Sequence, residues 1–322
     1  MKPTPESIFD LNGTSFEVIK PARLREGMVL KAGDVFARIG PKESIIEEQI
    51  HTVSLYNRGF PVPRVLTSGE IDGNWWYFTE TSLGHDTFHK IFTAEYRQHG
   101  YVTETSYVSY LQVIEAYAKA QSNPDNKTSI APDEFIESLI PHERVLPNYL
   151  YYGHEESGYL QALQLASTKL KGAPMGTIQH DLNPYNVLEK GVIDFELVGF
   201  GPVGFDTLMS ARWAGGWYTD YPSRMPVGYK LNSAQIAQSD AIVDTAATEN
   251  GLTAPTQFLQ EFLLLKSAWA VSNFDQTSPD WPPDKIAFRN YRANVLNLVV
   301  GQYLAGTPIA YQTLSSVPGG EI

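Results

Sequence analysis

The chain has 322 residues, of which 43% are hydrophobic and 19% charged, and this composition predicts a packed protein with one large domain or two lobes. A formal net charge of −12 argues against a nucleic-acid partner, which needs a basic surface, and the absence of cysteine excludes disulfides, thiolate nucleophiles and cysteine-ligated metals. Without a signal-peptide core or a long apolar run, we expect a cytoplasmic protein with no membrane partner.

The first 80 residues have the pattern of a strand-rich region with one helix. Residues 16–24, 28–31 and 35–41 are predicted strands. Residues 45–55 are a predicted helix, with an expected apolar face at Ile46, Ile50, Val53 and Leu55. The connection at residues 25–27 has no glycine-rich phosphate loop.

From about residue 85 onward the pattern becomes helical. The periodicity predicts helices over residues 107–118, 160–170, 256–271 and 286–304. Proline and aspartate gather in residues 220–232 and 275–284, which predicts loops there.

The most informative stretch is residues 177–195, in which three side chains have the order that phosphoryl transfer to a hydroxyl requires. Asp181 is followed by Asn186 and then, in an apolar run, by Asp194. Residues 187–188 and 192–195 are predicted to form a hairpin around a tight turn, which brings Asn186 close to Asp194. The two could then share a hard cation, while Asp181 lies outside the hairpin within reach of an acceptor.

An alternative interpretation treats Asp181 and Asn186 as turn formers, because both residue types favour loops. Asp194 is harder to explain in this way, since an unpaired carboxylate within an apolar strand is costly. With all three residues in register, a phosphoryl-transfer site is the better interpretation.

This stretch resembles the aminoglycoside phosphotransferase and choline kinase family, small-molecule kinases with a protein-kinase-like fold. The family form is His-Gly-Asp-Leu-x-Pro-x-Asn-Val/Ile-Leu followed by Val-Ile-Asp-Phe/Trp-Glu. Here residues 179–188 read Gln-His-Asp-Leu-Asn-Pro-Tyr-Asn-Val-Leu, and residues 192–196 read Val-Ile-Asp-Phe-Glu. The family histidine is therefore Gln179 and its glycine is His180. By resemblance, Asp206 is the buried carboxylate that accepts hydrogen bonds from the catalytic-loop backbone.

The resemblance extends upstream, where residues 35–41 are similar to the family strand that carries the ATP-phosphate lysine. This chain has Arg38 there, which binds phosphate through a fork and not a point charge. Lys42 or Lys31 could serve instead. Glu48, in preference to its neighbour Glu47, matches the family partner of the strand cation.

Residues 76–84 resemble the family hinge, in which backbone groups of Glu80, Thr81 and Ser82 would hold adenine. The resemblance implies an α+β, bilobal protein-kinase-like fold, with a small β-rich nucleotide-binding lobe (residues 1–83) and a larger helical lobe (residues 84–322) that carries the catalytic loop and the acceptor site.

The implied activity is ATP- and Mg²⁺-dependent transfer of the γ-phosphoryl group to a hydroxyl of a small molecule. Asp181 would be the catalytic base, Asn186 and Asp194 the metal ligands, and Arg38, held by Glu48, a phosphate contact. The acceptor stays open among aminoglycosides, choline-like amines, sugars and amino alcohols. The alternative is a catalytically impaired, pseudokinase-like regulator that binds nucleotide, which Arg38, Gln179 and the missing glycine-rich loop motivate.

Three further features have a bearing on function. Residues 199–204 fit Gly-x-Gly-x-x-Gly, but carboxylates in the preceding strand and the absence of a following strand argue against a dinucleotide site. His85 and His89 lack the companion residues of a zinc site and are expected near the hinge or surface. Trp213, Trp217 and Tyr218 are candidates for an acceptor pocket or for core packing.

Overall fold

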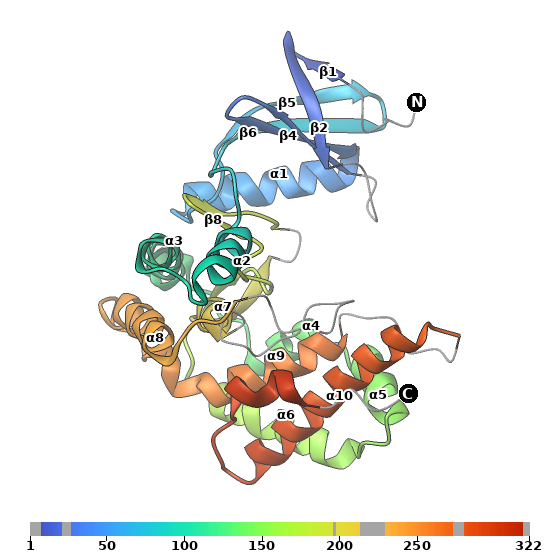
Figure 1. The fold of residues 1–322 in the computed structure, drawn as a ribbon, viewed down its shortest axis with the longest axis vertical. Coiled ribbons are helices and arrows are strands. Elements are labelled where there is room, and N and C mark those ends of the chain that lie inside the picture. The colour runs from blue at the N-terminus through green and yellow to red at the C-terminus, as the bar shows by residue number, and fades with distance from the viewer. Residues whose placement is uncertain (1–7, 21–26, 196–197, 213–228, 273–279, 318–322) are drawn as a thin grey trace.

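The computed structural model describes residues 8–20, 27–195, 198–212, 229–272 and 280–317. They form a sheet with one helix at one end of the long axis and a larger group of helices at the other (Figure 1). This arrangement confirms the predicted α+β, bilobal kinase-like fold. The predicted aromatic candidates Trp213, Trp217 and Tyr218 lie outside the described residues, as do residues 220–228 and 275–279 of the predicted loops. The second predicted loop extended too far, because helix α10 begins at Pro283.

Within the described residues, six antiparallel strands form the sheet in the order β1-β2-β3-β4-β6-β5. Side chains that alternate along β3 and β4, such as Leu30, Ala37 and Ile39, are fully buried, as the two-residue period of a half-buried strand requires. The strands are β1 (Ile8–Leu11), β2 (Thr14–Lys20), β3 (Met28–Ala32), β4 (Val35–Pro41), β5 (Val65–Asp72) and β6 (Trp75–Thr81).

Helix α1 (Lys42–Asn57) follows β4 and packs on β4, β5 and β6. The helix was predicted correctly, but its expected apolar face is only partly buried, since Leu55 is buried whereas Ile50 is 60% and Val53 is 37% exposed. Ile45 and Thr52 are buried together with Leu55. They share one helical face that includes polar side chains, so hydrophobicity alone selected the neighbouring stripe.

The larger part of the chain is built of helices around one extended apolar core. The predicted helical segments are all present, although residues 256–271 divide into a 3-10 turn (Pro255–Phe258) and a helix. The helices are α2 (Phe88–His99), α3 (Glu104–Ser122), α4 (Pro132–Leu139), α5 (His142–Tyr151), α6 (Glu156–Leu170), α7 (Phe205–Arg212), α8 (Ser233–Thr248), α9 (Leu259–Ser272) and α10 (Pro283–Leu304).

Helix α9 lies in the middle of this core, and every one of its residues from Glu261 to Ser272 is buried. This burial on all sides explains why most of its residues are apolar, with Glu261 and Lys266 as its charged residues. In the part of the chain that the structure describes, no helix is both long enough and apolar enough to cross a bilayer.

Two short antiparallel strand pairs carry the segment with the predicted site. Strand β7 (Met175–Ile178) pairs with β10 (Gly199–Pro202), and β8 (Val187–Leu188) pairs with β9 (Gly191–Val192). Since β10 returns antiparallel to β7, the glycines at residues 199–204 do not belong to a parallel βαβ unit, which agrees with the rejection of a dinucleotide site.

The β8–β9 hairpin is hydrogen-bonded to two segments of the chain, the one between α1 and β5 and the one between β6 and α2. The amide of Val192 donates to the carbonyl of Pro61 at 2.7 Å, and that of Lys190 donates to Leu83 at 2.9 Å. A Cβ on Gly191 would lie 2.2 Å from the Pro61 oxygen, so only glycine allows this approach. The predicted lobe boundary after residue 83 falls between β6 and α2 and stays a prediction.

Candidate active site

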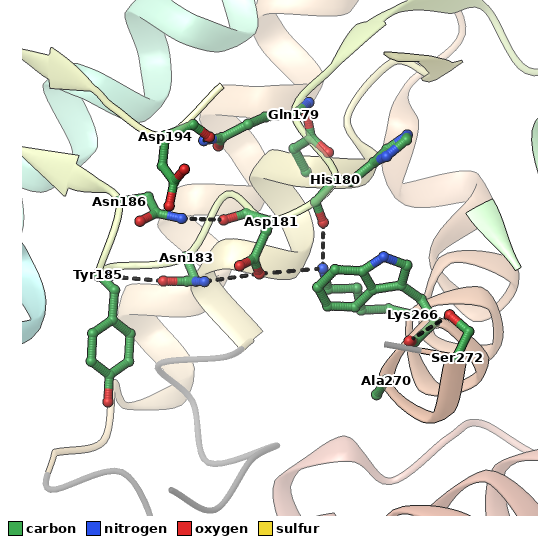
Figure 2. Close-up of polar contacts among 12 residues, drawn as sticks. Gln179, His180, Asp181, Asn183, Tyr185, Asn186, Asp194, Lys266, Ala270 and Ser272 are labelled. Carbon is green, nitrogen blue, oxygen red and sulfur yellow. Dashed lines mark hydrogen bonds and ion pairs between the residues drawn. The ribbon is translucent and has the colours of Figure 1, made fainter. Parts of the chain in front are cut away.

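Gln179 joins the loop after β7 to the segment that carries Asp194. Its side-chain Nε2 donates to the carbonyl oxygens of Ile193 at 2.7 Å and Asp194 at 2.6 Å (Figure 2). Its backbone N–H donates to Asp206 Oδ2 at 2.7 Å. Glutamine therefore fastens the loop in the position where the family pattern has histidine.

Asp206, at the start of α7, is 2% exposed and confirms the prediction of a buried carboxylate that holds the loop backbone. Its Oδ2 also accepts a hydrogen bond from the Tyr117 hydroxyl at 3.0 Å. Burial raises the pKa of Asp206 to about 6, and the hydrogen bonds from Gln179 and Tyr117 oppose the rise.

Asp181 is recessed but reachable, with 34% of its side chain exposed. Its Oδ1 accepts a hydrogen bond from Asn183 Nδ2 at 2.9 Å, which orients the carboxylate (Figure 2). Partial burial raises the pKa of Asp181, against the opposing effects of the Lys266 charge and the Asn183 amide. A carboxylate held in this way can accept a proton from a hydroxyl.

Asn186 and Asp194 are brought together as predicted, and the Asp194 carboxylate points toward the Asn186 amide (Figure 2). The Asn186 Nδ2 donates to the Asp181 carbonyl at 3.0 Å, which leaves its amide oxygen for a ligand. One detail of the prediction was wrong, because β9 ends at Val192 and Asp194 follows it with a φ of 69°. This left-handed backbone turns the carboxylate out of the hairpin toward Asn186.

The donor set at Asn186 and Asp194 fits Mg²⁺. The ion prefers oxygen ligands and is commonly held by one or two protein carboxylates together with substrate phosphates and water. Among the described residues, no group of three or more histidine, aspartate or glutamate side chains could hold a metal by itself. An amide oxygen and one carboxylate therefore suit a cation that arrives with nucleotide phosphates.

Arg38 on β4 lies between two carboxylates. Its Nε is 3.1 Å from Glu80 Oε1, and its Nη1 is 3.6 Å from Glu48 Oε1 on α1. Burial works to lower the pKa of Arg38, but the charges of Glu80 and Glu48 prevail and raise it. The pairing of Glu48 with Arg38 confirms the predicted register of strand and helix. Contact between Arg38 and phosphate stays a prediction.

The other candidate cations face elsewhere. Lys42 Nζ lies 2.6 Å from Glu70 Oε2, and Lys31 Nζ lies 3.4 Å from His85 Nδ1. Arg38 is therefore the cation of this region that lies beside the helix carboxylate, and its field also reaches Asp194.

The predicted hinge residues are largely engaged within the protein. The Glu80 side chain is 6% exposed and turned to Arg38. The backbone N–H of Thr81 donates to the Arg64 carbonyl at 3.0 Å, and the backbone N–H of Ser82 donates to the Asp34 backbone carbonyl at 2.9 Å. Adenine recognition by this segment stays a prediction, and it would have to use groups other than these two N–H donors.

Helix α2 supports the middle of the loop that carries Asp181 and Asn186, a contact that sequence reasoning did not find. The backbone N–H of His89 donates to the Pro184 carbonyl at 2.9 Å. The His89 ring stacks on Tyr185 with centroids 3.5 Å apart and an interplanar angle of 17°. His89 is thus a packing partner of the loop, which agrees with the rejection of a zinc site.

Lys266 is the main residue of the site that sequence reasoning missed. It lies on α9, its side chain is 6% exposed, and its Nζ donates to the His180 carbonyl and lies 3.8 Å from Asp181 Oδ1 (Figure 2). The available signal was a lysine directly after the apolar run at residues 262–265. A charge within a fully apolar helix requires a specific partner.

Comparisons with known proteins give matches at the level of structure. No family model matches the sequence, and no curated protein matches it significantly. A thermostable mutant of the aminoglycoside phosphotransferase APH(4)-Ia, in a ternary complex with AMP-PNP and hygromycin B, is 15% identical, with a TM-score of 0.50 and coverage of 94% of this chain and 96% of that chain.

Two further structures are similar. The aminoglycoside-3'-phosphotransferase of type VIII is 14% identical, with a TM-score of 0.48 and coverage of 80% of this chain and 94% of its own. APH(3'')-Id from Streptomyces rimosus ATCC10970, in complex with ADP and streptomycin, is 13% identical, with a TM-score of 0.45 and coverage of 79% and 92%. On the near-complete overlap with the APH(4)-Ia structure, this chain has the bilobal kinase-like fold of the aminoglycoside phosphotransferases.

Proposed function

We propose that the protein is an ATP- and Mg²⁺-dependent phosphotransferase that moves the γ-phosphoryl group to a hydroxyl of a small molecule. The observation that carries the proposal is the arrangement of Asp181, Asn186 and Asp194. The Asn186 Nδ2 donates to the Asp181 carbonyl at 3.0 Å, and the Asp194 carboxylate points toward the Asn186 amide group (Figure 2). The Asp181 carboxylate is presented separately, as a base for the acceptor requires.

In the proposed reaction, the acceptor hydroxyl oxygen bonds to the γ-phosphorus. The bond between that phosphorus and the bridging oxygen of ADP breaks, and ADP leaves with the bond's electron pair. The acceptor proton passes to Asp181. Because Oδ1 of Asp181 is held by Asn183 at 2.9 Å, we assign the proton to Oδ2.

Asn186 and Asp194 would hold the metal ion, and Arg38 would bind the phosphates from the sheet side. Bound Mg²⁺ offsets the negative charge of the phosphates and fixes their geometry. Arg38 is pre-oriented for this role by Glu48 and Glu80, at 3.6 and 3.1 Å. Holding the guanidinium in place lowers the entropic cost of binding.

The similar APH(4)-Ia structure supports the proposal, since it contains an ATP analogue and an aminoglycoside. The alternative, a catalytically impaired regulator, was motivated partly by Arg38 and Gln179. Arg38 lies against the helix carboxylate, and Gln179 makes hydrogen bonds that order the loop. Both observations favour turnover. Because the proposed reaction consumes ATP, we also propose a cytoplasmic location.

The test is transfer of labelled γ-phosphate to a panel of aminoglycosides, choline-like amines, sugars and amino alcohols, with and without Mg²⁺. Asp181→Ala should lower kcat by about 10²–10⁴, the usual effect of removing a positioned base, with little change in KM for ATP. Asp125→Ala, at an exposed turn, is the control. Magnesium-independent transfer, or equal rates for both variants, would refute the proposed mechanism.

A further inference from the structure

Lys266 is a buried cation whose ammonium group meets the catalytic loop from a distant helix. Its side chain is 6% exposed on α9, in the middle of the apolar core. Such a charge is retained in a core only where specific partners offset the desolvation cost. The partners therefore indicate what the residue does.

Three groups of the protein lie around the ammonium of Lys266. The first is the His180 carbonyl, which accepts a hydrogen bond. The second is Asp181 Oδ1, at 3.8 Å, and the third is the face of the Trp269 ring, whose centroid is 3.4 Å from Nζ. A cation over an indole ring is a favourable pair, so the ring helps to hold the ammonium in place.

Lys266 and Asp206 form hydrogen bonds to the backbone of two successive loop residues. Asp206 accepts the backbone N–H of Gln179 at 2.7 Å, and Lys266 donates to the carbonyl of His180, the next residue. His180 has a φ of 65°, a left-handed conformation that is unfavourable for a side chain with a Cβ. Such a conformation persists only where surrounding contacts enforce it.

We propose that Lys266 is a positioning residue for the catalytic base. It fixes the peptide group that precedes Asp181 and attracts Oδ1, so that Oδ2 faces the acceptor. This inference rests on the proposed phosphotransferase function for its catalytic consequence, but the contact with the loop stands apart from it.

The charges that face Lys266 from the described residues agree with this role. Asp181 on the loop and Asp206 on α7 favour its charged form, whereas burial and Arg292 on α10 oppose it. The balance lowers the pKa of Lys266 to about 8, so the charged form predominates at neutral pH. Conversely, the Lys266 charge works to lower the pKa of Asp181 and favours the ionised base.

A pair of variants separates the loop contact from the mere loss of a lysine charge beside a carboxylate and an aromatic ring. Lys266→Met keeps the apolar stem and removes the charge. Lys169→Met is the matched control, because Lys169 also lies near a carboxylate, Glu261 at 3.3 Å, and near a ring, Tyr303 at 4.9 Å, but not at the loop. We expect Lys266→Met to lower kcat by about 10², as misplaced catalytic groups do, with KM for ATP unchanged. Lys169→Met should retain parental kcat.

A chemical rescue makes the test specific for the ammonium. The chain has no cysteine, so K266C carries the only thiol. Alkylation of the unfolded variant with 2-bromoethylamine restores a side chain of lysine length with an ammonium, and 1-bromopropane gives an apolar chain of similar size. Both products are refolded beside parent protein taken through the same cycle. We expect only the aminoethylated protein to regain kcat, and equal recovery by both would overturn the proposal.

Hydrogen exchange of the backbone amides in residues 179–186 tests the contact without any activity. We expect faster exchange there in Lys266→Met and in the propylated protein than in Lys169→Met and the aminoethylated protein. If exchange shows this difference while the parent transfers no phosphate, the proposed function fails and the loop contact stands. Unchanged exchange together with unchanged kcat in Lys266→Met removes the inference, whatever the acceptor.

Discussion

The side-chain amide of Gln179 donates to the backbone carbonyl of Asp194 at 2.6 Å. The same nitrogen reaches the carbonyl of Ile193 at 2.7 Å. One side chain of the loop after β7 therefore sets the backbone of the segment that carries Asp194, and the spacing of the proposed base and the proposed metal ligands depends on it.

Gln179→Leu should reduce both turnover and stability. Leucine is similar to glutamine in size but has no N–H, so the carbonyl groups of Ile193 and Asp194 lose their hydrogen-bond donor. Leaving buried acceptors unsatisfied costs about 1–3 kcal/mol. Gln121→Leu is the control, since Gln121 is also buried and donates to Thr177 at 2.9 Å, away from Asp194. Denaturant unfolding should show a loss in both variants, and kinetics should show a fall in kcat in the Gln179 variant alone.

Asp194→Asn should abolish Mg²⁺-dependent transfer while the fold is retained. An amide oxygen lacks the negative charge that a carboxylate offers to a hard cation. Phosphate transfer measured across a range of Mg²⁺ concentrations is the assay, with thermal unfolding as a check on the fold. Asp86→Asn, which alters an exposed pair with Lys90, should behave as the parent. Parental turnover in Asp194→Asn would show that the metal is held elsewhere.

Arg38→Ala should raise KM for ATP, whereas Lys42→Ala should not. Arg38 is oriented toward the site by Glu48 and Glu80, while Lys42 pairs with Glu70 at 2.6 Å on the surface. Arg38→Lys restores the family residue. It should bind ATP better than the alanine variant does, because lysine keeps a positive charge at this position, although as a point charge and not as a fork. Steady-state kinetics on the three variants decide the matter, and damage confined to Lys42→Ala would contradict the assignment.

The buried Asp206 should make the protein less stable as pH rises from about 4 to about 6. Its pKa is about 6 in the folded protein, whereas the ordinary value for an aspartate is 3.8, so between these values the folded state holds a proton that the unfolded chain has released. The free energy of unfolding therefore falls with pH across this window, by about 3 kcal/mol for this group.

This effect is measured by urea unfolding of the parent and of Asp206→Asn in a series of buffers from pH 3.5 to pH 7, spaced by about one pH unit. Other carboxylates titrate in both proteins, so their contributions cancel in the difference. The parent should lose stability relative to the variant as pH rises. A constant difference would show that Asp206 stays ionised.

The backbone of His180 gives a comparison between two small residues. The φ of His180 is 65°, and only glycine enters this left-handed region without a penalty. The free energy of unfolding of His180→Gly should therefore exceed that of His180→Ala by about 1 kcal/mol. Both variants lose the imidazole ring, so the difference reports the backbone. Denaturant midpoints measure it, and an alanine variant as stable as the glycine variant would contradict the observed conformation.

Much of the site could be predicted because its residues are close in the chain. The spacing of Asp181, Asn186 and Asp194 is a property of one loop and one hairpin, and both are present. Lys266 could not be assigned, since it reaches the loop from a position 86 residues away from His180. A sequence shows that a charge interrupts an apolar helix, but it does not show which group the charge meets.

Glu80 illustrates a second limit. Its place in the family pattern predicted a backbone role, yet its side chain is 3.1 Å from Arg38. In the register of β4 and β6, Arg38 is opposite Phe78 and Phe36 is opposite Glu80, so Arg38 and Glu80 are diagonal neighbours on one face. Strand pairing decides this contact, and pairing was not predicted from the residues alone.

The attachment of the β8–β9 hairpin to Pro61 and Leu83 has a consequence for motion. These hydrogen bonds lie where the sheet meets the helices (Figure 1). If the sheet rocks over the helices, the pivot lies near the hairpin, and Asn186 and Asp194 stay close to the axis. Arg38 lies on β4 and would move with the sheet. In the proposed reaction, such a motion would withdraw Arg38 to release nucleotide, while Asn186 and Asp194, the proposed metal ligands, keep their spacing.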